Sequence, residues 1–263
     1  MDFPAPLIEG RLIRRYKRFL ADVELADGEI VVAHCPNPGS MLYCAPDDAR
    51  VWLSVKHSPT RKLPYTWELV EAYGAMVCVN TAQANEVVAE ALAEGRIPEL
   101  RGYDEVRREV MWSPGTRVDF VLSRHGETCL VEVKSATMRG GDRVTAFPDS
   151  VTARGTKHLG ELMNAVRAGH RAVLFFCCNR SDARSVRPAD EIDPLYGYTL
   201  RQAASAGVEI LAYRSDLQPS GISLAEAIPV ELPALDYTPP PVRVRRGAKK
   251  TVRVHRRVDA GVG

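Results

Sequence analysis

The chain has six cysteines in 263 residues but no Cys-x-x-Cys pair. Four of the six lie inside apolar runs such as Met76–Val79. The missing pair spacing argues against a structural zinc site and against a disulfide framework. The cysteines are therefore predicted to be reduced, buried thiols.

Long hydrophobic runs are also missing. No apolar stretch approaches the roughly 18 residues of a membrane span, and residues 1–10 lack the basic and then apolar segments of a secretory signal. The expectation is a cytoplasmic protein without membrane contact. Its 45% hydrophobic and 26% charged residues are ordinary for a globular protein, and its length suffices for one large domain or two small ones.

Most of the chain carries no excess of positive charge. Residues 234–263 hold eight Lys or Arg and two Asp, a net +6, which leaves residues 1–233 at −4 out of a total of +2. The last segment, 233–263, has a triple proline and too little apolar surface to order itself, so it is predicted to be a basic disordered tail. Solubility and non-specific attraction to polyanions explain such a tail equally well. Nucleic-acid binding by the remainder would need a local patch.

The central stretch of the sequence, residues 117–134, consists of two apolar runs separated by His125-Gly126. Such a pattern predicts a β-hairpin with a two-residue turn. Arg124 would then face Glu127 across the two strands.

The same register places Asp119 opposite Glu132, with about 5 Å between their Cβ atoms. Lys134 would lie on the same face as Glu132, because side chains alternate along a strand. Facing carboxylates repel, and a divalent cation such as Mg²⁺ or Mn²⁺ would offset the repulsion. The alternative is an exposed strand face on which all three side chains are solvated. The apolar flanks indicate a sheet buried on at least one side, and both explanations stay open.

Residues 7–79 hold several short strand-like runs, with a strong hairpin signal at Asp27-Gly28. Their spacing predicts a small β-barrel. The next 150 residues alternate between helical and strand-like patterns, which predicts a mixed sheet with helices on both faces. The predicted helices are 82–94, 156–169 and 195–207, and the predicted strands besides the hairpin are 106–111, 172–178 and 208–213.

Several segments resemble, in order, those of the sugar fermentation stimulation protein (SfsA) family. They are residues 15–23, 34–41, 66–69, 117–122, 131–135 and 146–162. The resemblance implies an α/β (α+β) protein with an OB-fold-like barrel over 1–79 and a restriction-endonuclease-like domain over 80–232. The second domain would be similar to the PD-(D/E)XK nucleases, and the tail 233–263 lies outside the resemblance.

The resemblance assigns the catalytic motif to Asp119, Glu132 and Lys134, and the acidic residue of the first core helix to Glu86. Residues 117 and 118 are Arg and Val, so the literal Pro-Asp pair of the motif is absent. Pro38 stands where a threonine is commoner.

In this assignment Asp119, Glu132 and the carbonyl of Val133 hold one Mg²⁺ or Mn²⁺. Lys134 orients the attacking water or takes its proton. Glu86 stands behind the metal or binds a second one, unless it is simply a solvated helix carboxylate.

Two groups of residues are candidates for binding nucleic acid. Arg154, Lys157 and His158 lie near a predicted helix N-terminus, where free amides attract phosphate. Alternatively, Thr156 caps that helix and His158 packs against the sheet. The second group combines basic residues with an aromatic one on a barrel strand, which suits backbone contact and base stacking but also an ordinary charged face. This group comprises Arg14, Arg15, Tyr16, Lys17 and Arg18, with Asn37 in a nearby turn.

The function predicted from the sequence is a metal-dependent nuclease acting on DNA, or else on RNA. The competing interpretation is a non-enzymatic, regulatory nucleic-acid-binding protein that keeps the nuclease-like fold. A small-molecule hydrolase using the same metal is a third. A homodimer is compatible with all three.

Overall fold

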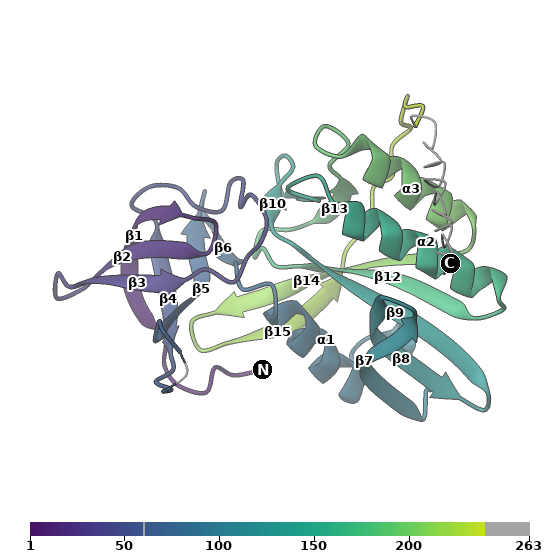
Figure 1. Ribbon diagram of the computed structural model, residues 1–263, viewed down its shortest axis with the longest axis horizontal. Helices are drawn as coiled ribbons and strands as arrows, with labels where there is room; N and C mark the ends of the chain where they lie inside the picture. Colours follow the sequence, from purple (N-terminus) through teal and green to yellow (C-terminus); the bar gives the residue numbers. More distant parts are fainter. Residues whose placement is uncertain (60, 240–263) are drawn as a thin grey trace, which may run out of the picture.

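The computed structural model describes residues 1–59 and 61–239 of the chain. Two regions lie side by side: a β-barrel, and a mixed sheet flanked by helices (Figure 1). The predicted fold class is confirmed in both parts. Residues 240–263, most of the predicted disordered tail, lie outside the described residues.

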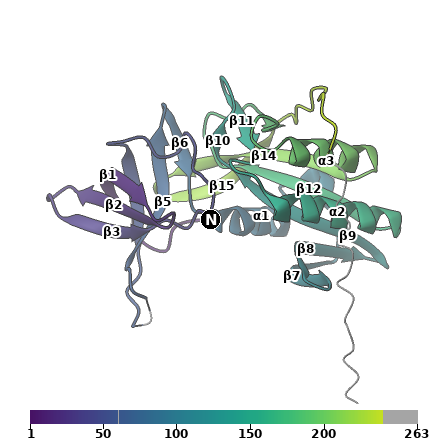
Figure 2. The same ribbon diagram turned by 45° about the horizontal axis from the view of Figure 1, so that its top comes forward.

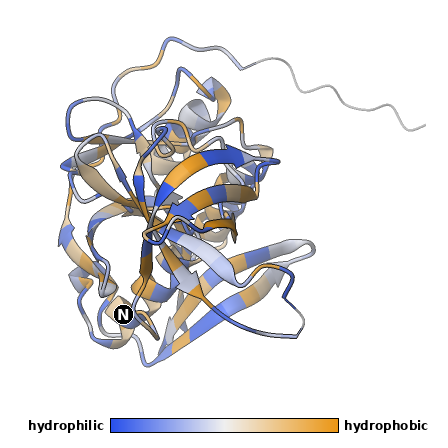
Figure 3. Ribbon diagram, turned by 90° about the vertical axis from the view of Figure 1, so that its left-hand side faces the viewer, coloured by the Kyte–Doolittle hydropathy of each residue, from blue (hydrophilic) through white to orange (hydrophobic). Residues whose placement is uncertain are grey.

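The barrel closes because its third and fifth strands pair with each other in addition to their other neighbours. Its strands are β1 (Ile8–Tyr16), β2 (Leu20–Leu25), β3 (Ile30–His34), β4 (Arg50–Val55), β5 (Tyr65–Ala72) and β6 (Ala75–Cys78). Figure 3 shows hydrophobic and hydrophilic residues alternating along several of them, as expected for strands with one face in a core. The hairpin predicted at Asp27-Gly28 joins β2 to β3, and Gly28 has φ +85 there.

The second region is built on a six-stranded sheet of order β15-β14-β12-β9-β8-β7. Strands β9, β12 and β14 run parallel, and the other neighbours are antiparallel. The strands are β7 (Glu105–Ser113), β8 (Thr116–Arg124), β9 (Glu127–Ala136), β12 (Arg171–Cys178), β14 (Glu209–Gln218) and β15 (Gly221–Ala227).

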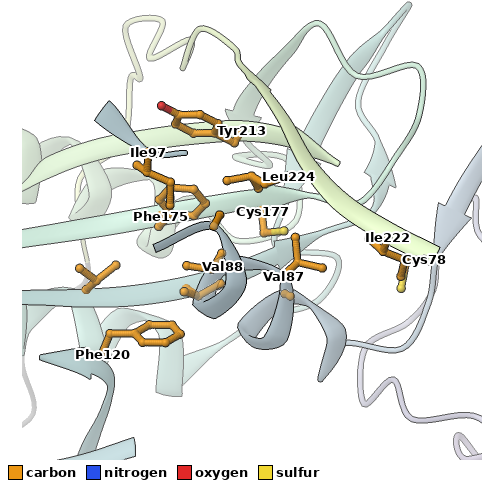
Figure 4. Packing of buried hydrophobic residues seen from close by; sticks show 14 of the residues in the cluster. Cys78, Val87, Val88, Ile97, Phe120, Phe175, Cys177, Tyr213, Ile222 and Leu224 are labelled. Carbon is orange, nitrogen blue, oxygen red and sulfur yellow. The ribbon is translucent and has the colours of Figure 1, made fainter. Parts of the chain in front are cut away.

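Helices cover both faces of this sheet, as predicted (Figures 1 and 2). Helix α1 (Gln83–Ala93) packs on one face against Phe120 and Phe175, in the core shown in Figure 4. Helices α2 (Ala153–Arg167) and α3 (Pro194–Ser205) pack on the other face.

Helix α2 begins three residues earlier than its sequence pattern predicts. Thr152 is the N-cap, and its Oγ1 accepts a hydrogen bond from the amide of Gly155 at 3.0 Å. Thr156, predicted as an alternative cap, instead donates through its hydroxyl to the carbonyl of Thr152. The first turn of α2 therefore includes Arg154.

A small three-stranded sheet was not predicted. It consists of β10 (Met138–Arg139), β11 (Val144–Phe147) and β13 (Ser185–Pro188). The sequence after Lys134 predicts a polar, glycine-containing loop, because strands of two to four residues carry too little periodicity to detect. Strand β15 was missed as well, and a single-turn 3₁₀ helix lies at Pro98–Leu100.

The two regions share buried contacts where they meet. Trp52 and Leu69 of the barrel belong to the same core as helix α1. The buried carboxylate of Glu68 accepts hydrogen bonds from Ser54 Oγ at 2.6 Å, from Asn80 Nδ2 at 2.7 Å and from Gln83 Nε2 at 3.0 Å. A network of neutral donors thus joins β4, β5 and α1 across the predicted boundary at residues 79 and 80, and that division into domains stays a prediction.

The six cysteines are all buried and none forms a disulfide, as predicted. Burial raises the pKa of Cys44, Cys129 and Cys177 to about 11, so these thiols are protonated at neutral pH. Within residues 1–59 and 61–239, no helix has the length and apolar character needed to cross a membrane.

Candidate active site

The β8–β9 hairpin has the turn and register that the sequence predicts. Arg124 pairs with Glu127 across a two-residue turn, and both turn residues have positive φ, His125 at 48° and Gly126 at 86°. The ladder runs from this turn to the pair of Phe120 and Val131 and ends there. Asp119 and Glu132 would form the next pair, so the ladder stops just before the two predicted catalytic acids.

Asp119 has its own partners at the point where the strands part. Its Oδ2 accepts a hydrogen bond from the amide of Val133 at 2.7 Å, and its Oδ1 accepts one from Asn85 Nδ2 of helix α1 at 3.0 Å. A continued register would have placed Val118 opposite Val133. The Asp119 carboxylate thus binds the backbone of β9, instead of facing Glu132 within the ladder as predicted.

This contact also places the carbonyl of Val133. The amide and the carbonyl of one strand residue point to the same edge of the strand. The amide of Val133 points at Asp119, so its carbonyl lies on that side too. A backbone oxygen is therefore available next to the Asp119 carboxylate, as the sequence assignment requires.

Glu132 lies in a buried cluster with two basic side chains. Lys134 Nζ donates to Glu132 Oε1 at 2.6 Å, and His158 Nδ1 of helix α2 bonds to the same oxygen. Lys134 Nζ and His158 Nδ1 are 3.5 Å apart. The Glu132 and Lys134 side chains are only 5% and 12% exposed. The predicted placement of Lys134 beside Glu132 on one strand face is confirmed.

The two carboxylates differ in their electrostatic surroundings. Burial, and next the charge of Glu132, raise the pKa of Asp119, although hydrogen bonds from Val133 and Asn85 oppose the shift. For Glu132 burial also acts to raise the pKa, but the hydrogen bond from His158 and the charge of Lys134 outweigh it, so its pKa is lowered. Each acid is thus mostly buried, and Asp119 lies within the electrostatic field of Glu132.

Glu86, predicted as an acidic ligand from the first helix, does not contact Asp119. Its carboxylate is half exposed and accepts a hydrogen bond from Arg108 Nη1 at 3.0 Å, an interaction that lowers its pKa. Its neighbour Asn85 is the α1 residue that reaches Asp119. Consecutive helix residues point about 100° apart, so only one of them can face the site, and the sequence does not show which.

The first turns of α2 bring basic groups to this site. His158 is 7% exposed and bonds Glu132 of β9, so the alternative in which it packs against the sheet is found, while its contact with phosphate stays a prediction. Arg154 Nε lies 3.4 Å from His158 Nε2, and Lys157 Nζ donates to the carbonyl of Gly115 at 3.1 Å. These three side chains line a depression of about 560 Å³ together with Arg117.

The barrel candidates lie apart from this cluster and divide into two sets. Arg15 is structural, since its guanidinium donates to the carbonyls of Asn37, Gly39 and Ser40. The Asn37 side chain is buried and bonds to Val79 and Gly39.

The other set faces outward. Arg14 pairs with Asp22 at 2.7 Å and lies over the Tyr16 ring. The side chains of Lys17 and Arg18 have no hydrogen bond or ion pair with any residue that the structure describes.

The donor set suits a hard cation held by few protein ligands. Mg²⁺ typically binds one or two carboxylates and keeps several waters or phosphate oxygens as further ligands. Asp119, Glu132 and the Val133 carbonyl match that requirement, and the part-buried Asp119 carboxylate is held by neutral donors alone among the described residues. Over residues 1–59 and 61–239 no group of three His, Cys, Asp or Glu is arranged to form a complete metal cage.

The fold and this site define a class of protein: an OB-type barrel joined to a restriction-endonuclease-like sheet. A family model described as "SfsA N-terminal OB domain" matches residues 13–79, and one described as "Sugar fermentation stimulation protein RE domain" matches residues 82–221. The chain belongs to the sugar fermentation stimulation protein family, as its sequence motifs indicate.

Curated relatives support the same conclusion. The sugar fermentation stimulation protein homolog of Pseudomonas paraeruginosa is 54% identical over 236 residues, which cover 88% of this chain and 100% of the relative. That of Geotalea uraniireducens is 51% identical over 232 residues, with the same coverage. The solved structure of Pyrococcus furiosus SfsA in complex with Ca²⁺ matches with a TM-score of 0.80 at 26% identity, covering 88% of this chain and 98% of that one.

Proposed function

We propose that the protein is a divalent-metal-dependent nuclease that hydrolyses phosphodiester bonds in DNA or RNA. The observation that carries this proposal is the cluster at the end of the β8–β9 ladder. There Asp119, a part-buried acid with a raised pKa, lies in the electrostatic field of the buried Glu132, which bonds Lys134 directly. A pure binder of phosphate has no evident need for two buried carboxylates, because they repel its ligand.

In this mechanism Asp119, Glu132 and the Val133 carbonyl hold Mg²⁺ or Mn²⁺. The bound cation supplies positive charge to the attacked phosphate and acidifies a water molecule. The Pyrococcus furiosus relative was solved with Ca²⁺, which also prefers oxygen ligands. The role of Glu86 as a further metal ligand stays a prediction. In the structure its carboxylate is paired with Arg108.

Lys134 orients the attacking water or, in its uncharged amine form, takes the proton of that water. For either role, Lys134 Nζ must exchange its hydrogen bond with Glu132 for one with the water molecule. This requires only a local movement of the Lys134 side chain. His158 keeps Glu132 hydrogen-bonded meanwhile, because it bonds the same carboxylate oxygen. Arg154, Lys157 and Arg117 around the adjacent depression bind the flanking phosphates of the strand.

A second candidate function is non-enzymatic binding of nucleic acid. One observation favours it: Lys134 and His158 already compensate the charge of Glu132, so that half of the cluster is balanced without a metal. The basic depression beside His158 would then bind phosphates with no chemistry following.

The test is incubation of the purified protein with linear, circular and single-stranded DNA and with RNA, in Mg²⁺ or Mn²⁺. Asp119→Asn and Lys134→Ala should each lower the cleavage rate by about 100-fold or more. Asp104→Asn, which changes an exposed carboxylate of the same domain, is the control and should cleave normally. Cleavage of equal rate in all variants would come from a contaminant. Metal binding without cleavage of any substrate would favour the binding protein.

The tail offers a separate test of nucleic-acid contact. Removing the residues after Pro233 should reduce the slope of log affinity for DNA against log salt concentration, by about 0.9 for each phosphate that the tail neutralises. An unchanged slope would show that the tail does not bind DNA.

A further inference from the structure

Two exposed tyrosines lie together on the barrel, outside the cluster of acids. Tyr43 follows β3 and is 46% exposed, and Tyr73 lies in the β5–β6 turn and is 56% exposed. Their rings meet edge to face, with centroids 6.1 Å apart. The guanidinium of Arg139, on β10 of the other region, lies 5.9 Å from the Tyr73 ring centroid. A solvent-facing aromatic pair thus lies where the two regions meet.

The backbone around this pair turns sharply. Nine non-glycine residues among those described have positive φ, and five of the nine line one groove beside the tyrosines. Three of them lie in the short β1–β2 and β5–β6 turns, where positive φ is usual. The five are Lys17 at 46°, Arg18 at 65°, Met41 at 56°, Tyr43 at 61° and Tyr73 at 53°.

The groove carries positive charge, whereas residues 1–233 as a whole carry negative charge. The side chains of Lys17 and Arg18 are exposed and have no hydrogen bond or ion pair with any described residue. Arg14 also lines the groove but is paired with Asp22, and Asp47 is the only acid among the described residues that line the groove. Residues 1–233 carry a net charge of −4, so this local excess of cations suits a polyanion.

The groove beside the tyrosines lies next to a pocket between the two regions. The groove with Tyr43 and Tyr73 shares Arg18 with a pocket of about 340 Å³ between the two regions. That pocket is lined from the barrel side by Gly39 and from the other side by Ser135, the residue after Lys134. A flexible chain that follows these depressions would therefore approach the end of β9.

We propose that this groove binds single-stranded nucleic acid, with bases stacked on Tyr43 and Tyr73 and phosphates against Lys17, Arg18 and Arg139. Unpaired bases expose their faces to aromatic side chains, whereas the bases of a duplex stack on one another. The bound strand continues through the pocket between the regions toward the end of β9. Only this last step rests on the proposed nuclease function; binding at the tyrosines does not.

The binding test uses the full chain in EDTA, which prevents cleavage, with a fluorescein-labelled oligothymidine and a duplex of equal length. Tyr43→Ala and Tyr73→Ala should each weaken binding of the single strand about tenfold in fluorescence anisotropy, and change duplex binding less than about twofold. Tyr73→Phe keeps the stacking ring and should bind like the unchanged protein. Ile30→Ala is the matched control and should also bind normally. Ile30 is 62% exposed and lies at the start of β3, beside the β2–β3 turn.

Unchanged affinity in both alanine variants would overturn the proposal, and so would an equal loss for duplex and single strand. Light scattering that shows a dimer in the unchanged protein and a monomer in the tyrosine variants would assign the patch to a contact between copies, which also overturns it. The proposed nuclease function fails separately. Tyrosine-dependent binding without any metal-dependent cleavage removes the nuclease alone, while Asp119-dependent cleavage of single strands unaffected by both alanine variants removes this inference alone.

Discussion

The two halves of the candidate active site bury the same chemical group in opposite ways. On the α1 side, Asp119 is held by neutral donors, the Asn85 amide and the Val133 backbone, and its pKa is raised. On the α2 side, Glu132 is held by Lys134 and His158, and its pKa is lowered. The difference identifies Asp119 as the acid whose charge still lacks a counterion, and Glu132 as the acid already integrated into a salt-bridged core.

The comparison predicts that one acid contributes mainly to stability and its neighbour mainly to function. Removing the charge of a compensated acid leaves its basic partners buried and unpaired, which is costly. Removing the charge of an uncompensated acid relieves a strain that is useful only when a cation binds. The following changes test whether the two halves behave this differently.

Glu132→Gln should have the largest effect on stability. It leaves the ammonium of Lys134 buried without its carboxylate, so the free energy of unfolding should fall by about 3–5 kcal/mol. Urea denaturation followed by circular dichroism measures this loss. Asp119→Asn is the matched variant and should leave stability unchanged or slightly higher. If both variants lose the same amount, the two acids are equivalent and the comparison is wrong.

Metal binding should stabilise the folded protein, and this gain should depend on the charge of Asp119. At a Mg²⁺ or Mn²⁺ concentration about 100 times the dissociation constant, the unchanged protein should gain about 2.7 kcal/mol. A thermal melt with and without metal reads this as a rise in Tm. Asp119→Asn should show no rise in Tm. A rise of equal size in that variant would place the cation elsewhere.

The two neighbouring residues of helix α1 should differ in their effect on activity. Asn85→Ala removes a hydrogen bond to Asp119 and should lower metal affinity or the cleavage rate about 10-fold to 100-fold. Glu86→Gln only disturbs a half-exposed pair with Arg108, which contributes little. Titration of Mn²⁺ against both variants measures the difference. The reverse order of effects would establish Glu86 as the ligand that the sequence predicts.

The pH dependence of stability should have opposite signs for the two acids, because the pKa of Glu132 is lowered and that of Asp119 is raised. The contribution of Glu132 is present above its ordinary pKa of 4.5 and is lost as the pH falls through the lowered value. The destabilisation caused by ionised Asp119 is absent below its ordinary pKa of 3.8. It grows as the pH rises from there through the raised pKa.

Unfolding measured from pH 3 to 8 for the unchanged protein, Glu132→Gln and Asp119→Asn separates the two terms. The difference between the unchanged protein and Glu132→Gln should disappear at low pH. The difference between the unchanged protein and Asp119→Asn should appear only as the pH rises. Parallel curves for all three proteins would contradict both assignments.

Much of this arrangement follows from the sequence because it depends on local patterns. The turn at His125-Gly126 and alternation along a strand fix the register of the hairpin and place Lys134 beside Glu132. The order of helices and strands follows from apolar periodicity. The family follows from six ordered motifs.

The rest depends on tertiary packing that no single segment encodes. The end of the ladder at Phe120 arises from the competing bond between Asp119 and the Val133 amide. The choice of Asn85 over Glu86 depends on how α1 is rotated on its sheet. The contact of His158 with Glu132 joins residues 26 positions apart, and only the adjacency of His158 to a helix start hinted at it.

The buried Glu68 network has a practical consequence for dissecting the molecule. A barrel ending at residue 79 would lose Asn80 and Gln83, two of the three donors that hold Glu68. It would also expose Trp52 and Leu69, which are covered by the helix that follows. An isolated barrel is therefore expected to aggregate or to need a substituted residue at position 68. Binding measured on such a fragment would report on a perturbed fold. The barrel and the sheet region are therefore best studied together in one intact polypeptide.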